Sequence, residues 1–366
     1  MELLTQRLLL IVMLCLPFLA HAQSNAYDEL MQLYEEKHQF QGAVLVATEG
    51  RVLFENAYGY SDREQRKQNT LAHQFLIGSL TKSFTAVAIM RLVQERKVDL
   101  HAPLSLYLPD LDPQKAERLT LHLLLKHQSG LPNHLERLIS FDKPEISSQE
   151  ILAVINDAPL QFEPGSQYQY GNLNYHLAAM VIENVTNLSY VQAMAKLVFA
   201  PLNMANSGVE RLHALPENRA KGYRKKLFGI SHDENQMSYA LGSGDIYSTV
   251  DDLLKWDQAL YGEGFLTQQS KALLFSKESE AFGYYGYGFR VQPYQRAIGT
   301  EDFGILTRHG GSMDGFLANL HRYTDDKLTV IVLGNIRSFP IRNLTFELKE
   351  IALGIPVGQR QRKPVE

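Results

Sequence analysis

The chain has 366 residues, of which 45% are hydrophobic and 21% are charged, an ordinary composition for a globular protein that can bury a large core. Its 36 Lys and Arg residues are balanced by 40 Asp and Glu residues, which gives a formal net charge of -4. Since nucleic-acid binding depends on excess positive charge, this balance argues against nucleic acid as the main partner.

Residues 1–22 have the pattern of a secretory signal peptide. Arg7 precedes an apolar run over residues 8–20, and Ala-His-Ala at positions 20–22 matches a cleavage site before Gln23. The alternative is a membrane anchor, but the run is shorter than the roughly 20 apolar residues that span a bilayer. We therefore expect an exported protein, periplasmic or secreted, with no stable membrane span after cleavage.

The only cysteine, Cys15, lies inside this segment. The mature chain would then contain no thiol, which excludes disulfides, thiolate catalysis and cysteine-ligated metal.

The mature chain begins with strand signals. Residues 42–47 and 52–54 are apolar and partly β-branched, and they flank a Glu-Gly turn, which predicts a β-hairpin. From Ser79 to about Glu95 no Gly or Pro interrupts a series of apolar residues at helical spacing. We expect a long, largely buried helix that begins at or just before Ser79.

The middle of the chain predicts helices, and the C-terminal part returns to strands. Residues 104–162 are helical segments broken by Pro and Gly, and residues 173–185 predict another helix. Strand character marks residues 291–332, and residues 344–353 close with a helix. Strands at both ends predict an α/β (α+β) fold, in which one antiparallel sheet from the N- and C-terminal segments is flanked by helices and carries an inserted helical lobe. The expected units are a signal peptide over 1–22, one domain over 23–353 and a short polar tail over 354–366.

Ser-x-x-Lys occurs twice, at Ser79 to Lys82 and at Ser140 to Lys143. At a helix start, residues three apart share a face, so Lys82 would stand beside the Ser79 hydroxyl, and the N-H groups there favour a developing anion. Pro144 disfavours helical conformation at Lys143, so the second match is expected to be a loop coincidence. The alternative for Ser79 is a helix N-cap without chemistry.

Two further segments bring polar groups that suit hydrolysis. Tyr170-Gly171-Asn172 follows a Pro-Gly turn, and a phenol whose pKa is lowered by a nearby lysine can act as a base. Asn172 offers an amide to a substrate or to Lys82; the alternative is a surface tyrosine in a loop. In His309-Gly310-Gly311-Ser312 the paired glycines let a strand approach a ligand closely. The backbone N-H groups of Ser312 and Ser79 could then form an oxyanion hole.

Together these three segments resemble the serine β-lactamase and penicillin-binding-protein superfamily, in particular its class C β-lactamase, DD-peptidase and esterase branch. The resemblance covers nearly the whole mature chain. It extends to Gly42-Ala43-Val44, to residues 125–132 and to residues 248–253.

The resemblance implies an acyl-enzyme mechanism without a cofactor. Ser79 would attack a carbonyl, Lys82 and Tyr170 would relay its proton to the leaving group, and Tyr170 would activate water for deacylation. The class A branch instead uses a Glu-x-x-Leu-Asn segment, which is absent here. Substrate contacts are expected from Asn172, His309, Gly310 and Gly311.

One departure from the pattern bears on the substrate. Class C β-lactamases typically carry Lys-Thr-Gly at the third motif, where this chain has His309, and an unperturbed histidine is mostly neutral at pH 7. We therefore expect a DD-carboxypeptidase, D-amino-acid amidase or esterase rather than an efficient β-lactamase, acting on a small molecule or a peptidoglycan-like peptide. The alternative source of a carboxylate-binding charge is Arg296 or Arg308, both just before the motif.

The sequence motifs of other hydrolase classes and of nucleotide-binding proteins are absent from this chain. Gly-x-Ser-x-Gly, His-Glu-x-x-His and the Gly-x-x-x-x-Gly-Lys nucleotide fingerprint are all absent, so neither a metal nor another cofactor is expected. The alternative to an enzyme is a penicillin-binding or sensor-like module that is acylated but turns over poorly. The sequence leaves the natural substrate and the oligomeric state open.

Overall fold

A computed structural model describes residues 25–133, 145–211, 215–227, 229–235, 237–297 and 300–357. The expected signal peptide, the Ser140 to Lys143 motif and the tail beyond residue 357 lie outside these ranges.

The centre of the molecule is a six-stranded sheet in the order β10-β11-β12-β13-β1-β2, with every neighbouring pair antiparallel. The N-terminal strand β1 pairs along its whole length with the C-terminal strand β13, from Gly42 opposite Gly334 to Thr48 opposite Leu328. This confirms the predicted fold, a sheet made from both ends of the chain. The strands are β1 (Gly42–Thr48), β2 (Arg51–Tyr58), β10 (Arg290–Gln295), β11 (Phe303–Met313), β12 (Phe316–Tyr323) and β13 (Leu328–Gly334).

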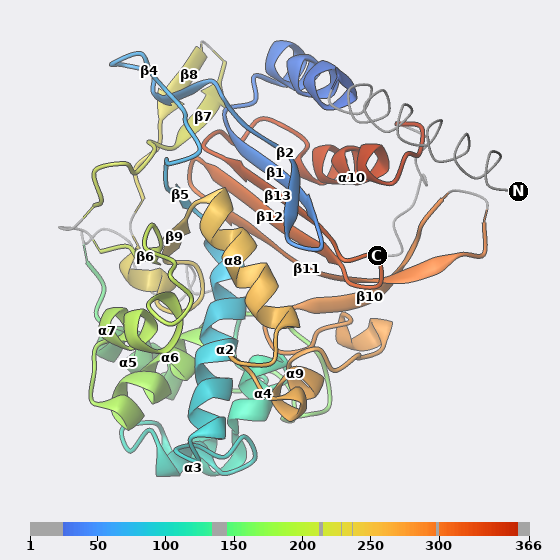
Figure 1. The fold of residues 1–366 in the computed structure, drawn as a ribbon. Helices are drawn as coiled ribbons and strands as arrows, with labels where there is room; N and C mark the ends of the chain where they lie inside the picture. Colours follow the sequence, from blue (N-terminus) through green and yellow to red (C-terminus); the bar gives the residue numbers. More distant parts are fainter. Residues whose placement is uncertain are drawn as a thin grey trace, which may run out of the picture.

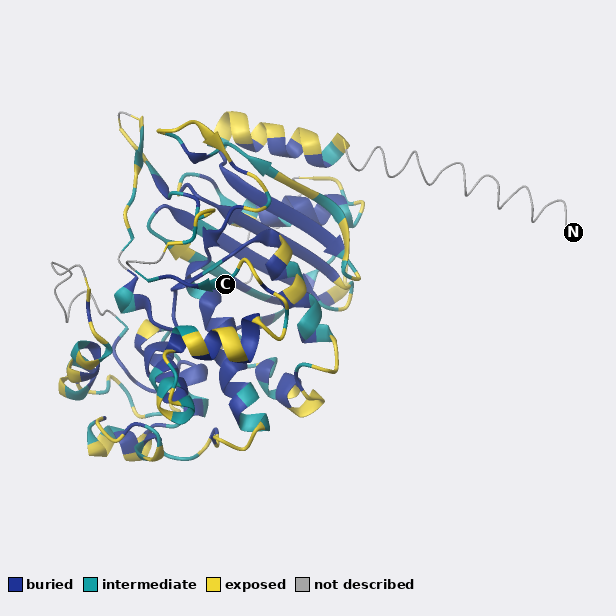
Figure 2. Cartoon of the chain, turned by 60° about the vertical axis from the view of Figure 1, so that its left-hand side comes forward, coloured by how far each residue is buried: buried dark blue, intermediate teal, exposed yellow. Residues whose placement is uncertain are grey.

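Helices cover both faces of this sheet, because side chains that alternate along each strand are apolar on both sides. On one face, Val44 and Val332 pack in a core with the helix over residues 25–38 and with α10 (Ile341–Ala352). Figure 1 shows these two helices lying on the same side of the sheet. Figure 2 shows the helix over 25–38 turning its exposed face outward and its buried face inward.

The other face packs against α2 (Thr81–Gln94) and α8 (Val250–Tyr261) and leads into the helical lobe (Figure 1). Residues 81–90 of α2 are all buried, and Phe84 stacks on Trp256 of α8 with ring centroids 4.0 Å apart. Because α2 is buried on all sides, its apolar residues are not confined to one stripe.

The remaining elements build the lobe and the connections around it. The predicted helix at 173–185 is α6, and its bounds are one residue wider at each end. Among the described residues, no helix is both long and apolar enough to span a membrane. The lobe contains η2 (Leu104–Leu106), α3 (Pro113–Arg118), α4 (Leu121–Leu125), α5 (Ser148–Asp157), α6 (Asn172–Thr186), α7 (Tyr190–Met194) and η4 (Ala195–Phe199). The other elements are β3 (Tyr60–Asp62), β4 (Lys67–Gln68), β5 (Phe75–Leu76), η1 (Gly78–Leu80), β6 (Gly208–Val209), β7 (Tyr223–Lys226), β8 (Gly229–His232), η5 (Ser238–Ala240), β9 (Ile246–Ser248), α9 (Gln268–Leu274) and η6 (Glu280–Phe282).

Candidate active site

Ser79 lies in η1, a 3-10 helix of one turn that connects β5 to α2. Gly78 before it has φ +51°, a left-handed conformation that bends the chain sharply into the helix. Neither η1 nor α2 has a side-chain hydrogen bond at its N-cap, and the N-cap of α2 is Leu80. The alternative in which Ser79 serves as a helix cap is therefore wrong, and its partly exposed hydroxyl is free for other contacts.

Lys82 is fully buried one turn further along, and its Nζ has three oxygen neighbours. These are Ser79 Oγ at 3.2 Å, Asn172 Oδ1 at 2.8 Å and the backbone carbonyl of Ser243 at 2.8 Å. The two carbonyl oxygens can only accept hydrogen bonds. A neutral Lys82 amine therefore donates to both of them and directs its lone pair at the Ser79 hydroxyl.

The charge state of Lys82 agrees with this geometry. Burial lowers the pKa of Lys82 to about 7, against the opposing effect of the Asp245 carboxylate. A large fraction of the amine is then neutral near pH 7, which is the condition for a general base.

Tyr170 lies over the same lysine, with its ring centroid 4.9 Å from Lys82 Nζ. Its hydroxyl oxygen is buried and has no hydrogen-bond partner among the described residues. Burial raises the pKa of Tyr170 above its ordinary value, and the nearby Ser79 hydroxyl offsets only part of this rise. The expectation that Lys82 lowers the pKa of this phenol is wrong, because the loss of water around a phenolate outweighs its neighbours. Lys82, rather than Tyr170, has the pKa of a base.

The glycines of the third motif do not act alike. A Cβ at Gly311 would lie 1.8 Å from the Ile77 carbonyl oxygen, so this glycine lets β11 press against the turn that carries Ser79. The Ser312 nitrogen lies close by, since a Cβ on Gly78 would be 2.7 Å from it. A Cβ at Gly310 would instead meet Asn319 Oδ1, and Nδ2 of the same side chain donates to the Thr345 hydroxyl of α10 on the opposite face of the sheet. Gly311 and Ser312 thus adjoin the site, whereas Gly310 faces away from it.

His309 is buried, and both of its ring nitrogens have partners. Nδ1 lies 2.6 Å from the Gly310 carbonyl oxygen, and Nε2 lies 2.8 Å from the Tyr285 hydroxyl. Because a carbonyl only accepts, Nδ1 carries the proton and the Tyr285 hydroxyl donates to Nε2. Burial, followed by the charge of Lys82, lowers the pKa of His309 to about 3, so the ring is neutral at pH 7.

Comparison with known proteins identifies the family to which this chain belongs. The Beta-lactamase family profile matches residues 25–352. The chain belongs to the Beta-lactamase family. Penicillin-binding protein 4* of Bacillus subtilis (strain 168) is 28% identical to it over 337 residues, which cover 86% of this chain and 72% of that protein.

Two solved structures of similar sequence have the same fold. A penicillin-binding protein from Bacillus halodurans has 26% identity and a TM-score of 0.73, covering 85% of this chain and 95% of that one. D-amino acid amidase from Ochrobactrum anthropi SV3, complexed with L-phenylalanine amide, has 27% identity and a TM-score of 0.76, covering 91% and 96%. Homologues of these kinds support a serine hydrolase.

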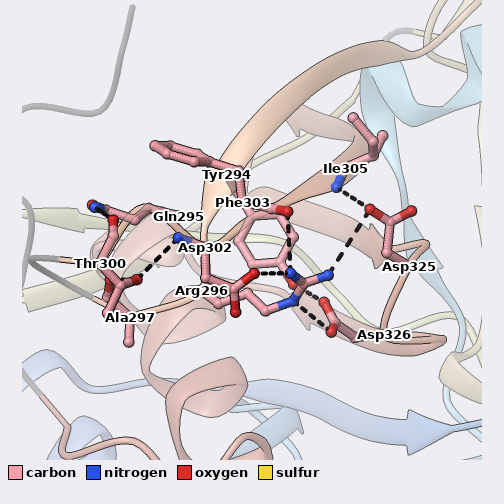
Figure 3. Close-up of polar contacts among 10 residues, drawn as sticks. All are labelled: Tyr294, Gln295, Arg296, Ala297, Thr300, Asp302, Phe303, Ile305, Asp325 and Asp326. Carbon is pink, nitrogen blue, oxygen red and sulfur yellow. Dashed lines mark hydrogen bonds and ion pairs between the residues drawn. The ribbon is translucent and has the colours of Figure 1, made fainter.

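The two arginines expected to replace a Beta-lactamase family lysine are engaged elsewhere. Arg296 is held by carboxylates around the end of β10, with its Nε 2.8 Å from Asp326 and further contacts to Asp302 and Asp325 (Figure 3). Arg308 is adjacent to His309 in β11 and so points to the opposite face, where burial and the charge of Arg342 in α10 lower its pKa to about 10. The expectation that either arginine binds a substrate carboxylate is not supported.

Other residues of the site escaped the sequence reasoning. Tyr285 holds His309, and Arg290 bonds to Tyr168 and to the Gly283 carbonyl beside it. Arg290 is placed opposite Arg308 by the pairing of β10 with β11, and Tyr285 bridges to Arg290 from the segment before β10, which no local pattern reveals. Ser243 stands between Gly242 and Gly244, and that pair of glycines was the one available signal of a special backbone turn.

Proposed function

We propose that the protein is an exported serine hydrolase that forms an acyl-enzyme with an ester or amide substrate, of the DD-carboxypeptidase, D-amino-acid amidase or esterase type, or a weak β-lactamase. The observation that carries this proposal is the contact set of Lys82. Its two acceptor-only neighbours leave one position of the nitrogen for the Ser79 hydroxyl. Membership of the Beta-lactamase family supports it.

In the proposed reaction, neutral Lys82 takes the proton of the Ser79 hydroxyl while Ser79 Oγ forms a bond to the substrate carbonyl carbon. The N-H groups of Ser79 and Ser312 bind the oxyanion. Tyr170 passes its proton to the leaving alcohol or amine as the carbonyl bond to that group breaks, and it receives the proton that Lys82 took from Ser79. Water then attacks the acyl-enzyme and gives a proton to Lys82 through Tyr170, and Lys82 returns this proton to Ser79 Oγ as the acid leaves.

The third motif brings no charge to the substrate end of the site. His309 carries no charge near pH 7, and it bonds to Tyr285 and to its own strand. The motif therefore lacks the cation that Lys-Thr-Gly presents to a carboxylate, and the nearby cation of Arg290 donates to the Gly283 carbonyl and the Tyr168 hydroxyl instead. Because two of the compared proteins are penicillin-binding proteins and another is a D-amino acid amidase, we place D-amino-acid amides, peptidoglycan-like peptides and esters first among the substrates to test.

The test is labelling of the mature protein with a fluorophosphonate, followed by peptide mass spectrometry and turnover of p-nitrophenyl esters, a D-Ala-D-Ala peptide and a chromogenic cephalosporin. We expect the adduct on Ser79, with labelling and turnover both lost in Ser79→Ala. Ser140→Ala is the matched control, since it alters the second Ser-x-x-Lys and should leave both intact. An adduct on Ser140 would refute the proposal.

A second candidate function is a receptor that is acylated but turns over slowly. The raised pKa of Tyr170 favours it, because a phenol that stays protonated is a poor base for the deacylating water. The lifetime of the β-lactam adduct separates the two functions. An adduct that persists for hours without ester turnover identifies a receptor, and rapid loss of the adduct identifies an enzyme.

A further inference from the structure

The third neighbour of Lys82, the Ser243 carbonyl, belongs to a tight turn over residues 240–245 that ends at a buried carboxylate. Asp245 has no exposed surface. Its Oδ1 accepts the Gly242 N-H at 3.1 Å, and its Oδ2 accepts from Arg211 Nη1 at 3.1 Å. The backbone carbonyl of Asp245 accepts the Glu210 N-H at 2.7 Å. The Asp245 side chain thus closes the turn on itself and ties it to the neighbouring strand segment.

The same turn is fixed to the helix that carries Lys82. The Thr85 hydroxyl donates to the Gly242 carbonyl at 2.6 Å, one helical turn beyond Lys82. Gly242 has φ +65°, and a Cβ there would lie 2.7 Å from the Cβ of Ala179 in α6. The turn therefore has little room to move, and the Ser243 carbonyl is held against Lys82 Nζ from both sides.

We propose that Asp245 is a positioning residue that sets the proton affinity of Lys82, through its negative charge and through the turn that presents the Ser243 carbonyl. Arg211 keeps Asp245 ionised, and its side chain is partly exposed at the surface. This inference rests on the proposed function, in which neutral Lys82 is the base. It goes further by assigning the charged group that, against the larger effect of burial, raises the pH at which that base becomes available.

The charges around the pair support this assignment. Besides Asp245, Lys82 faces His309 of β11, His127 after α4, Tyr170 and Tyr175, all of which are uncharged near pH 7. Among the described residues, Asp245 is therefore the anion that acts on Lys82, and it faces Arg211 and the neutral phenol of Tyr190. The nearby ring of His176 is neutral as well, since burial lowers its pKa to about 3.

The sign of the effect follows from these groups. Burial raises the pKa of Asp245 to about 6 and Arg211 opposes the rise, so the carboxylate is mostly ionised at pH 7. An anion beside an ammonium group favours the protonated form and raises the pKa of Lys82. Removal of this anion should lower the pKa of Lys82, so that the base is neutral at lower pH but accepts a proton less readily.

The test is the rate of Ser79 labelling by a fluorophosphonate as a function of pH, which reports acylation without a natural substrate. The wild-type rate should fall as the pH drops below about 7, where Lys82 becomes protonated. In Asp245→Asn the acidic limb should move to lower pH and the plateau should fall, so that the two profiles cross. The matched control is Asp252→Asn, an equally buried aspartate in α8 that bonds to Lys255 and Ser207. Its acidic limb should coincide with that of the wild type.

A second variant keeps the test decisive if Asp245→Asn does not fold. Arg211→Gln removes a partly exposed side chain and lets Asp245 hold its proton at higher pH, so the acidic limb should shift in the same direction. The double variant should shift no further than Asp245→Asn alone. An unmoved limb, or profiles that fall in parallel at every pH, would overturn the inference. Absence of any adduct on Ser79 in the wild type would instead overturn the proposed function.

Discussion

A lysine buried in protein gives up its proton more readily than one in water, because the contacts that remain replace only part of its hydration, and Lys82 is an example. Its ammonium has two carbonyl oxygens and one hydroxyl within 3.2 Å. These contacts offset only part of the lost hydration, so the pKa falls to about 7. At the residue scale, reactivity at Ser79 thus depends on the burial of its neighbour more than on any feature of the serine itself.

At the same scale, Tyr170→Phe should lower both acylation and deacylation by roughly 10²-fold or more, because the proton carrier between Ser79 and the leaving group is lost. Stability should hardly change, since the Tyr170 hydroxyl is buried without a partner among the described residues. Presteady-state kinetics and thermal unfolding measure the two effects.

Tyr175→Phe is the matched control, with the opposite pattern expected. The Tyr175 hydroxyl donates to the Leu125 carbonyl at 2.9 Å, so its loss should cost about 1–3 kcal/mol of stability and leave the chemistry in place. Unchanged kinetics in Tyr170→Phe would show that Lys82 acts without a phenolic relay.

The sequence predicts contacts between site residues that are close in the chain. It does not predict contacts between residues that only the fold brings together. The three-residue interval predicts that Lys82 stands beside Ser79, as the structure places it. The pKa of Tyr170 was predicted with the wrong sign, because a motif names neighbours but not the amount of water that the fold removes. The contact between Tyr285 and His309 joins two segments that are 24 residues apart and that only the fold brings together.

At the scale of elements, the site exists because β11 and the turn η1 approach each other without side chains between them. Beyond Arg308, β10 no longer pairs with β11, and the end of β11 lies against η1 instead. Gly311 and Gly78 make this approach possible from the two sides. The paired glycines predict a close backbone approach, but the partner they approach is the protein's own chain.

Gly311→Ala should separate these two elements. Its Cβ would overlap the Ile77 carbonyl oxygen, and a displacement of about 1 Å between Ser79 and the Ser312 N-H can cost on the order of 10²-fold in rate. Gly264→Ala, where no atom lies within 4 Å of the new Cβ, is the control and should retain full activity. Fluorophosphonate labelling rates would measure both, and equal rates would show that the approach of β11 is dispensable.

At the scale of the whole molecule, a buried ion pair joins the sheet to the helices over it. Arg322 of β12 donates to Asp257 of α8 at 2.5 Å, and neither side chain is exposed by more than 1%. Arg322→Met should lower the free energy of unfolding by about 3–5 kcal/mol, because Asp257 would be left buried without its cation.

The exposed pair of Lys327 and Glu49 gives the comparison for this variant. Its side chains are 61% and 68% exposed, so Lys327→Met should change stability by at most about 1 kcal/mol. Urea unfolding measures both variants. Similar midpoints for the two would mean that the buried pair does not hold the layers together.

The architecture was predictable at this scale because strands at both ends and helices between them admit few arrangements. Apolar, partly β-branched runs at 42–47 and 328–333 predict strands, and the structure pairs them as β1 and β13. The pair of Arg322 and Asp257 was not predictable, since its partners lie in separate segments and carry no spacing signal.

The pairing of β1 with β13 also sets the order in which the molecule can be completed. β1 precedes the whole helical lobe in the chain and β13 follows it, so the contact between β1 and β13 cannot form until the lobe has been synthesised. Contacts between distant segments form slowly, because a long loop must close before they contribute. The two parts of the sheet, β1-β2 and β10-β13, are therefore joined only after the lobe between them has been made.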